Sequence, residues 1–258
     1  MIPDMLKNLW DAVMFLCITL ITKTVNGFKR LGSKTSNANE GAANFLSWRL
    51  AVEANNVRAW RTVPTQYQRH IESYMVGGQY NRDLELIMGQ VSSFADEIVL
   101  SDDGLDAWIF DIDDTCISNL PFYKQKRFGC DPFDRLGFRA WVLAGECPAM
   151  PSVLNAFNKL VERGFKLFLV TGRDEETFGC VTINNLQNQG FVGYERVILR
   201  MAENKGQGAS DYKSGVRKKL IEEGYRIWGN VGDQWSDLQG DFVGNRTFKL
   251  PNPMYFVS

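Results

Sequence analysis

The spacing of apolar residues changes near residue 100 of the chain. From Phe45 to Leu100, apolar residues recur every three or four positions, which is typical of helices that bury one face. One helix is expected after Pro64 and ends before Gly77, and a second is expected from about Asn81 to Leu100. We expect this helical segment to pack as a small accessory layer beside the rest of the fold.

Beyond residue 100, the pattern indicates strands that alternate with helices. Short apolar runs, typical of buried strands, lie at residues 107–110, 165–170, 196–199 and 225–231. Amphipathic stretches, each followed by a glycine where a helix would end, lie between them at residues 152–163, 175–189 and 211–223. The alternation predicts an α/β fold, in which helices cover both faces of a parallel sheet.

The N-terminus carries an apolar stretch at residues 12–21. This stretch is shorter than the roughly 20 residues of a membrane span, and it suits the apolar part of a secretory signal peptide. Asp4 and Asp11 flank it, so a membrane-associated amphipathic helix is the alternative interpretation. The polar run at residues 32–40 has the composition of a linker.

These patterns together predict the domain organisation. Residues 1–40 are expected to form the leader and linker, and residues 44–258 the folded domain. Within that domain, residues 44–100 form the helical accessory segment and residues 105–258 form the α/β core.

Composition narrows the chemistry that the chain can perform. The chain has 29 Lys and Arg against 30 Asp and Glu, and this balance argues against a basic face that binds nucleic acid. A single histidine, His70, excludes two-histidine zinc sites and phosphatase mechanisms that need several histidines. Five cysteines at wide, irregular spacings indicate neither a disulfide framework nor a zinc cluster. Acid–base catalysis is therefore expected from carboxylates or lysine.

Polar residues follow the predicted strands where ligands bind in such sheets, beyond the carboxyl ends. Acids, a Thr-Gly turn and a lysine are expected to meet at this edge: Asp111, Asp113, Thr171, Gly172, Lys213, Asp233 and Asp237. Clustered carboxylates without histidine favour a hard cation with oxygen ligands, most simply Mg²⁺. This combination predicts a site for phosphoryl transfer, with a phosphorylated small molecule as the substrate.

Each of these features also has an ordinary structural explanation. Aspartates after strands commonly cap helices, and Thr-Gly is a common turn. Lys213 alone is typical of a solvated surface lysine, and Asp233 and Asp237 could cap a final helix. Arg173, beside the Thr-Gly turn, could contact either phosphate or its acidic neighbours at residues 174–175. Their joint occurrence at the ends of successive elements favours the catalytic interpretation.

Longer stretches around these residues resemble a known family. They include SWRLAVEANNVRAW, WIFDIDDTCISNLPFY, FLVTGR, YKSGVRKKLIEEGYRIWGNVGDQWSDL and NRTFKLPNPMY. From about Ser47 onward, the chain resembles phosphatases of the haloacid dehalogenase superfamily. Within that superfamily, it is similar to the plant acid phosphatases and vegetative storage proteins related to bacterial class B acid phosphatases. The resemblance implies a Rossmann-like parallel sheet with helices on both faces, plus the N-terminal helical segment.

The resemblance also implies a role for each residue that matches a family motif. In the first of the family's four motifs, Asp111 takes the position of the nucleophile and Asp113 that of the general acid and base. Thr171, with Gly172 beside it, takes the phosphate-binding position of the second motif. Lys213 takes the position of the lysine in the third motif.

A metal site is implied by the same motifs. Asp111 and Asp233 match metal ligands, Asp113 is expected to contribute its backbone carbonyl, and Asp237 matches the supporting acid of the fourth motif. The metal expected here is Mg²⁺.

The resulting functional prediction is an acid phosphatase that hydrolyses phosphate monoesters through an aspartyl-phosphate intermediate. A vegetative storage protein with little or no activity is the alternative, although Asp111 is retained where some storage relatives have lost the nucleophile. A phosphotransferase that uses another acceptor hydroxyl is a third interpretation.

The resemblance further implies a homodimer. The leader favours the secretory pathway, either the vacuole or the cell exterior, with membrane association through residues 12–21 as the alternative. In the secretory pathway, Asn245 would be a glycosylation sequon.

Overall fold

The computed structural model describes residues 40–257, so the expected leader lies outside the described part of the chain. Residues 40–53 are helical. Contacts divide the chain into two compact units after Trp48, and the elements discussed below all belong to the second unit, Arg49–Ser258. Within residues 40–257, no helix is both long enough and apolar enough to cross a membrane.

The second unit alternates strands and helices along the chain. Its helices are α2 (Gln68–Val76), α3 (Gln79–Asp96), α4 (Leu120–Gln125), α5 (Arg135–Ala144), α6 (Pro151–Glu162), α7 (Glu175–Asn188), α8 (Ala209–Glu222) and α9 (Trp235–Leu238). Its strands are β1 (Asp106–Asp111), β2 (Lys166–Asp174), β3 (Arg196–Arg200), β4 (Arg226–Gly232) and β5 (Arg246–Lys249). Short 3₁₀ turns lie at Thr65–Tyr67, Arg127–Gly129 and Ala202–Asn204.

The five strands form one parallel sheet in the order β3-β2-β1-β4-β5. The predicted α/β class is therefore confirmed, and four of the strands lie where the apolar runs place them. The strand β5 was not predicted, and neither were the helices α4 and α5, which are inserted between β1 and α6. Because all strands are parallel, their carboxyl ends share one edge, and the residues that follow them meet there.

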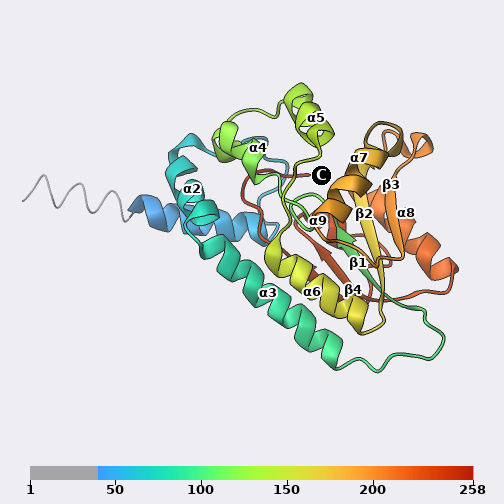
Figure 1. Cartoon of the computed structure of the whole chain (residues 1–258). Coiled ribbons are helices and arrows are strands. Elements are labelled where there is room, and N and C mark those ends of the chain that lie inside the picture. Colours follow the sequence, from blue (N-terminus) through green and yellow to red (C-terminus); the bar gives the residue numbers. More distant parts are fainter. Residues whose placement is uncertain (1–39, 258) are drawn as a thin grey trace, which may run out of the picture. The chain divides into compact units, whose positions relative to one another are not determined.

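Alternation of side chains along β1 supplies the cores on both faces of the sheet. Ala107 and Ile109 belong to a buried cluster with Tyr212 and Val216 of α8. Trp108 and Phe110 alternate with these residues, and the Trp108 ring packs against Phe94 of α3 at a centroid distance of 6.0 Å. The helices α3 and α6 lie side by side (Figure 1).

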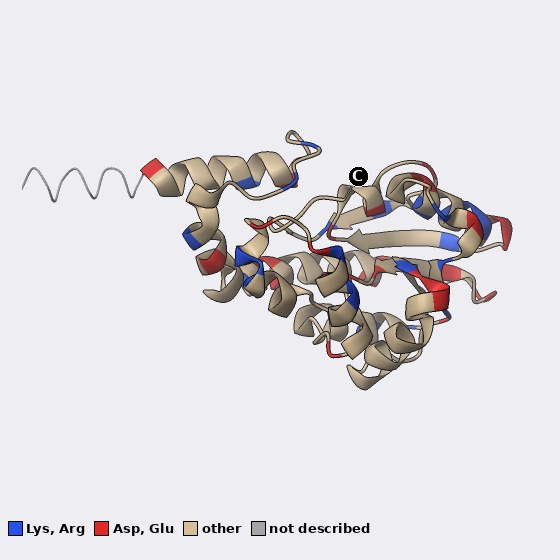
Figure 2. Ribbon diagram, turned by 90° about the horizontal axis from the view of Figure 1, so that it is seen from above, with Lys and Arg blue, Asp and Glu red and all other residues tan. Residues whose placement is uncertain are grey.

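Charged positions are interspersed along the helices and strands (Figure 2). Asp106, the first residue of β1, is a buried acid. Its carboxylate accepts a hydrogen bond of 2.9 Å from Arg226 and another of 2.7 Å from Trp228. These contacts join the first residues of β1 and β4, the two strands whose other ends carry most of the candidate acids.

Candidate active site

The first motif begins at the last residue of β1 and continues in a tight turn. Asp111 is 6% exposed, and the Cys116 thiol donates a hydrogen bond of 3.2 Å to its carbonyl. The carbonyl of Ile112 accepts from the backbone N–H groups of Cys116 and Ile117, both at 3.0 Å, which closes the turn. The turn carries Asp113 away from the strand, so the two aspartates have different hydrogen-bonding partners.

Lys213 joins the first and fourth motifs. Its Nζ donates to Oδ1 of Asp111 and, over 2.6 Å, to Oδ1 of Asp237, and all three side chains are buried. Burial alone would lower the pKa of Lys213, but the two carboxylates outweigh it and hold this pKa above its usual range. The lysine is therefore a charged, buried bridge, and the interpretation of Lys213 as a solvated surface residue is wrong.

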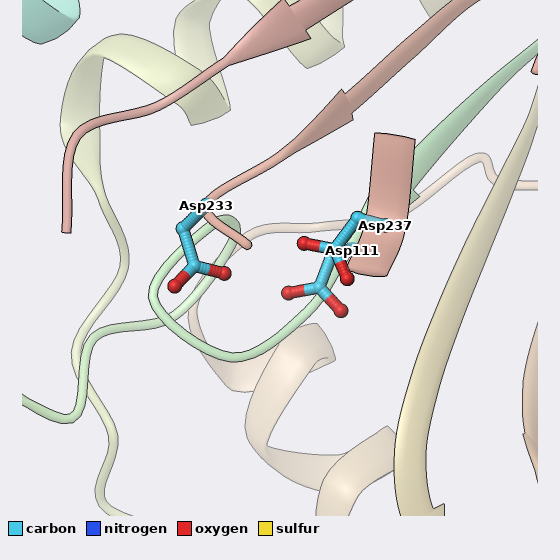
Figure 3. Close-up of side chains that lie close together, drawn as sticks. All are labelled: Asp111, Asp233 and Asp237. Carbon is cyan, nitrogen blue, oxygen red and sulfur yellow. The ribbon is translucent and has the colours of Figure 1, made fainter. Parts of the chain in front are cut away.

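Asp111, Asp233 and Asp237 form a buried acidic cluster at the edge of the sheet. One carboxylate oxygen from each lies within 4.8 Å of the others, and Figure 3 shows the three carboxyl groups close together. Burial raises the pKa of Asp111 to about 7, although Lys213 acts to lower it. Burial and the neighbouring charges of Asp237 and Asp111 raise the pKa of Asp233 well above its ordinary value.

The electrostatics of this cluster suit a cation. Desolvated carboxylates whose pKa values are raised lack sufficient positive charge around them, and a hard divalent cation with oxygen ligands supplies that charge. Both oxygens of Asp237 already accept hydrogen bonds, from Lys213 at 2.6 Å and from the backbone N–H of Gln234 at 2.9 Å. The residues therefore fit a metal ion held mainly by Asp111 and Asp233, with Asp237 in support.

Asp113 belongs to a second network beside the cluster. Arg173 donates to Asp113 Oδ1 from Nη2 at 2.7 Å and to Oδ2 from Nε at 3.0 Å. Asn119 donates to Oδ1 at 2.9 Å, and the Thr171 hydroxyl donates to Oδ2 at 3.2 Å. Burial would raise the pKa of Asp113, but Arg173 dominates and holds it below its usual value.

Sequence reasoning missed the partner of Arg173. Phosphate or the acids at residues 174–175 were the two alternatives, whereas its guanidinium contacts Asp113, 60 residues away. Asp174 instead caps α7 by accepting from the backbone N–H of Thr177 at 2.8 Å. The carboxylate of Asp113 points into the Arg173 network, and its role as a metal ligand through the backbone carbonyl remains a prediction.

Thr171 and Gly172 were predicted to form a turn after the strand, but β2 extends to Asp174 and includes them, with a shift of register against β3 at this place. Thr171 is fully buried, and its hydroxyl accepts from the backbone N–H of Arg173 at 3.1 Å. No heavy atom lies within 4 Å of the point where a Cβ of Gly172 would be, apart from its chain neighbours. A small anion can therefore approach the main chain at Gly172 without a steric clash.

The C-terminal residues complete the surroundings of the fourth motif. Asn252 donates to Asp233 Oδ2 at 2.6 Å, and the Tyr255 hydroxyl donates to Asp114 Oδ2 at 2.8 Å. Both residues lie within the stretch NRTFKLPNPMY, which carried part of the family resemblance but no assigned chemistry.

The fold and site are those of a phosphatase of the α/β class, with a buried acidic cluster that fits a cation at the carboxyl edge of the sheet. The chain belongs to the family described as HAD superfamily, subfamily IIIB (Acid phosphatase), which matches residues 30–258. The description of this family names acid phosphatases, which agrees with the enzyme class that the sequence predicts.

Individual relatives and one solved structure agree with this assignment. Acid phosphatase 1 of Solanum lycopersicum is 44% identical over 211 residues, which cover 82% of each chain. Vegetative storage protein 2 of Arabidopsis thaliana is 35% identical over 218 residues, which cover 83% of this chain and 81% of the relative. The structure of the class C acid phosphatase from Bacillus anthracis superposes with a TM-score of 0.60 at 19% identity, covering 71% of this chain and 82% of that chain.

Proposed function

We propose that the protein hydrolyses phosphate monoesters through an aspartyl-phosphate formed on Asp111. The observation that carries this proposal is the buried bridge from Lys213 to Asp111 and Asp237, with Asp233 within 4.8 Å of both acids. A lysine and a cation at this place offset the charge of a phosphate, so that an anionic carboxylate can approach phosphorus. We assign the binding of phosphate oxygens to Thr171 and to the main chain at Gly172, where the space beside the glycine is open.

Asp111 and Asp233, with the backbone carbonyl of Asp113, are the residues that would hold Mg²⁺. When bound, Mg²⁺ supplies Lewis-acid stabilisation of the charge that develops on the phosphoryl oxygens. Lys213 and Asp237 fix the orientation of the Asp111 carboxylate, because both carboxylates are tied to the same ammonium group.

The reaction uses Asp111 and Asp113 in two steps. In the first, an oxygen of Asp111 attacks phosphorus, the ester P–O bond breaks, and Asp113 donates a proton to the leaving oxygen. In the second, Asp113 accepts a proton from water, which attacks the aspartyl-phosphate and releases phosphate and free Asp111. The Arg173 contact favours the carboxylate form of Asp113, which suits the second step. Proton donation in the first step requires Asp113 to leave that contact.

The test is turnover of 4-nitrophenyl phosphate by the purified protein, with Mg²⁺ and after its removal by a chelator. Asp111→Asn is expected to lose at least about a thousandfold in kcat, because amide oxygen is a poor nucleophile. Asp211→Asn, an exposed acid at the start of α8, is the matched control and keeps the wild-type rate. Retention of most of the wild-type rate by Asp111→Asn would show that this mechanism is wrong.

Accumulation as a storage protein is the second candidate function, and the similarity to vegetative storage protein 2 favours it. It predicts high abundance in vegetative tissue together with negligible specific activity. Specific activity of the purified protein, measured beside its abundance, separates the two functions. Product analysis in the presence of added alcohols separates hydrolysis from phosphotransfer.

We also propose a location in the secretory pathway. Support comes from a relative named Stem 31 kDa glycoprotein of Glycine max, which is 41% identical over 212 residues, covering 82% of each chain. The sequon residue Asn245 is exposed and directly precedes β5, as attachment of a glycan requires an accessible site. A loss of mass on endoglycosidase treatment of the protein from its source tests this location, and an unchanged mass argues against glycosylation.

A further inference from the structure

The segment that follows β5 is irregular in secondary structure but well buried. Leu250, Asn252 and Met254 are each at most 3% exposed. The backbone N–H of Leu250 donates to the carbonyl of Gly232 at 2.8 Å, which lays the segment against the end of β4. We call residues 250–257 the C-terminal segment.

Two side chains donate to the same oxygen of Asp233. One, Asn252, belongs to the C-terminal segment, and the other, Gln234, is contacted by it. Asn252 Nδ2 donates to Asp233 Oδ2 at 2.6 Å, and Gln234 Nε2 donates to the same oxygen at 2.7 Å. The Gln234 amide is held in turn by the main chain of the segment. Its Oε1 accepts from the N–H of Val257 at 3.0 Å, and its Nε2 lies 3.4 Å from the carbonyl of Tyr255.

Asn252 is itself fixed in one orientation. Its Oδ1 accepts from the backbone N–H of Met254 at 3.0 Å, so its Nδ2 is the atom that faces Asp233. Its own backbone N–H donates to Glu53 Oε1 at 2.9 Å, and Lys249 Nζ donates to Glu53 Oε2 at 2.8 Å. The donor to Asp233 is thus anchored on two sides.

Two amide donors occupy Asp233 Oδ2, which leaves Oδ1 as the oxygen that can bind a cation. Oδ1 accepts a long hydrogen bond, of 3.5 Å, from the hydroxyl of Thr115. We propose that Asn252 is a positioning residue that sets which oxygen of Asp233 faces the metal, and that the C-terminal segment thereby tunes metal affinity. The inference rests on the proposed function, in which Asp233 is a metal ligand. Hydrogen bonds to a ligating carboxylate orient it and strengthen metal binding.

The experiment is calorimetric titration of the full chain with Mg²⁺ alone, in the absence of substrate. Asn252→Ala is expected to weaken Mg²⁺ binding by about 10- to 100-fold, the range for loss of a residue that orients a metal ligand. Asn252→Ser is a second variant, because its hydroxyl can still accept from Met254 N–H but is too short to reach Asp233. It is expected to weaken binding in the same way while preserving the local turn.

Asn185→Ala is the matched control. Asn185 is also buried, at 1% exposed, and its amide holds the Cys147 main chain through bonds of 3.0 and 2.8 Å. Its loss is expected to lower the melting temperature and to leave the Kd for Mg²⁺ unchanged. Phosphatase activity of the Asn252 variants is expected to recover at high Mg²⁺ concentration, which a general packing defect would not produce.

The outcomes separate this inference from the function on which it rests. If the wild-type protein binds Mg²⁺ and only the Asn252 variants have a higher Kd, the inference is supported. Equal Kd values in wild-type, Asn252→Ala and Asn252→Ser proteins, all folded, would overturn it and leave the proposed metal site intact. No heat of Mg²⁺ binding to the wild-type protein would overturn the proposed metal site, and the inference with it.

Discussion

Replacement of Lys213 by methionine probes the centre of the site. Methionine has a similar length but no charge, so Lys213→Met leaves Asp111 and Asp237 buried without their shared ammonium partner. Removing one member of a buried ion pair costs about 3–5 kcal/mol. At roughly 2–4 °C per kcal/mol for a chain of this size, the melting temperature is expected to fall by roughly 6–20 °C.

The loss of stability expected for Lys213→Met depends on pH. Burial raises the pKa of Asp111 to about 7 even with Lys213 present, and loss of the lysine raises it further. A carboxyl whose pKa is higher in the folded than in the unfolded state favours folding at low pH and loses this contribution as the pH rises. The variant is therefore expected to lie close to wild type near pH 4 and to show a deficit that grows as the pH rises above 7.

The assay is urea unfolding followed by circular dichroism, in Mg²⁺-free buffer at about pH 4 and about pH 8. Lys218→Met, on the same helix, is the control. Lys218 lies 3.7 Å from Glu222 with both side chains about 60% exposed. Such a pair contributes less than about 1 kcal/mol. Equal stability of Lys213→Met and wild type at the higher pH, or an equal deficit at both values, would refute the buried bridge.

Two further predictions concern neighbouring acids. Because Arg173 holds the pKa of Asp113 low, Arg173→Met is expected to move the acidic limb of aspartyl-phosphate hydrolysis to higher pH, and Arg173→Lys to move it less. Rapid-quench measurement across pH checks this, and an unmoved limb contradicts it. Burial raises the pKa of Asp114 from 3.8 to about 6, so its contribution to stability, at most about 3 kcal/mol, is lost as the pH rises between these values. Asp114→Asn is expected to remove that part of the pH dependence of urea unfolding, and an unchanged dependence argues against it.

The elements that were predictable are those whose burial is continuous along the sequence. The strand β1 is buried at every position, so its apolar run is visible without a structure. The strand β5 has only four residues, of which Phe248 alone is fully buried, so no run appears. The helix α5 buries only Val142, and one buried residue gives no apolar stripe of helical period.

The same distinction applies to the site. Asp111 ends β1, Asp233 directly follows β4 and Thr171 lies near the end of β2, so the shared edge of a parallel sheet was enough to bring them together. The contact of Arg173 with Asp113 depends on how β2 lies beside the turn after β1, 60 residues earlier. Side-chain pairings of this kind are fixed by tertiary approach, and no local spacing encodes them.

The contacts of Glu53 have a consequence for how the protein matures. Glu53 accepts from Lys249 and from the Asn252 main chain across sequence separations of 196 and 199 residues, and its carbonyl accepts from Trp235. Contacts over such distances form only after the intervening chain has been made and ordered. Asn252, which donates to Asp233, follows every strand of the described sheet in the sequence. A nascent chain can therefore order most of its sheet while Asp233 still lacks Asn252, so the sheet forms before the proposed metal site is complete.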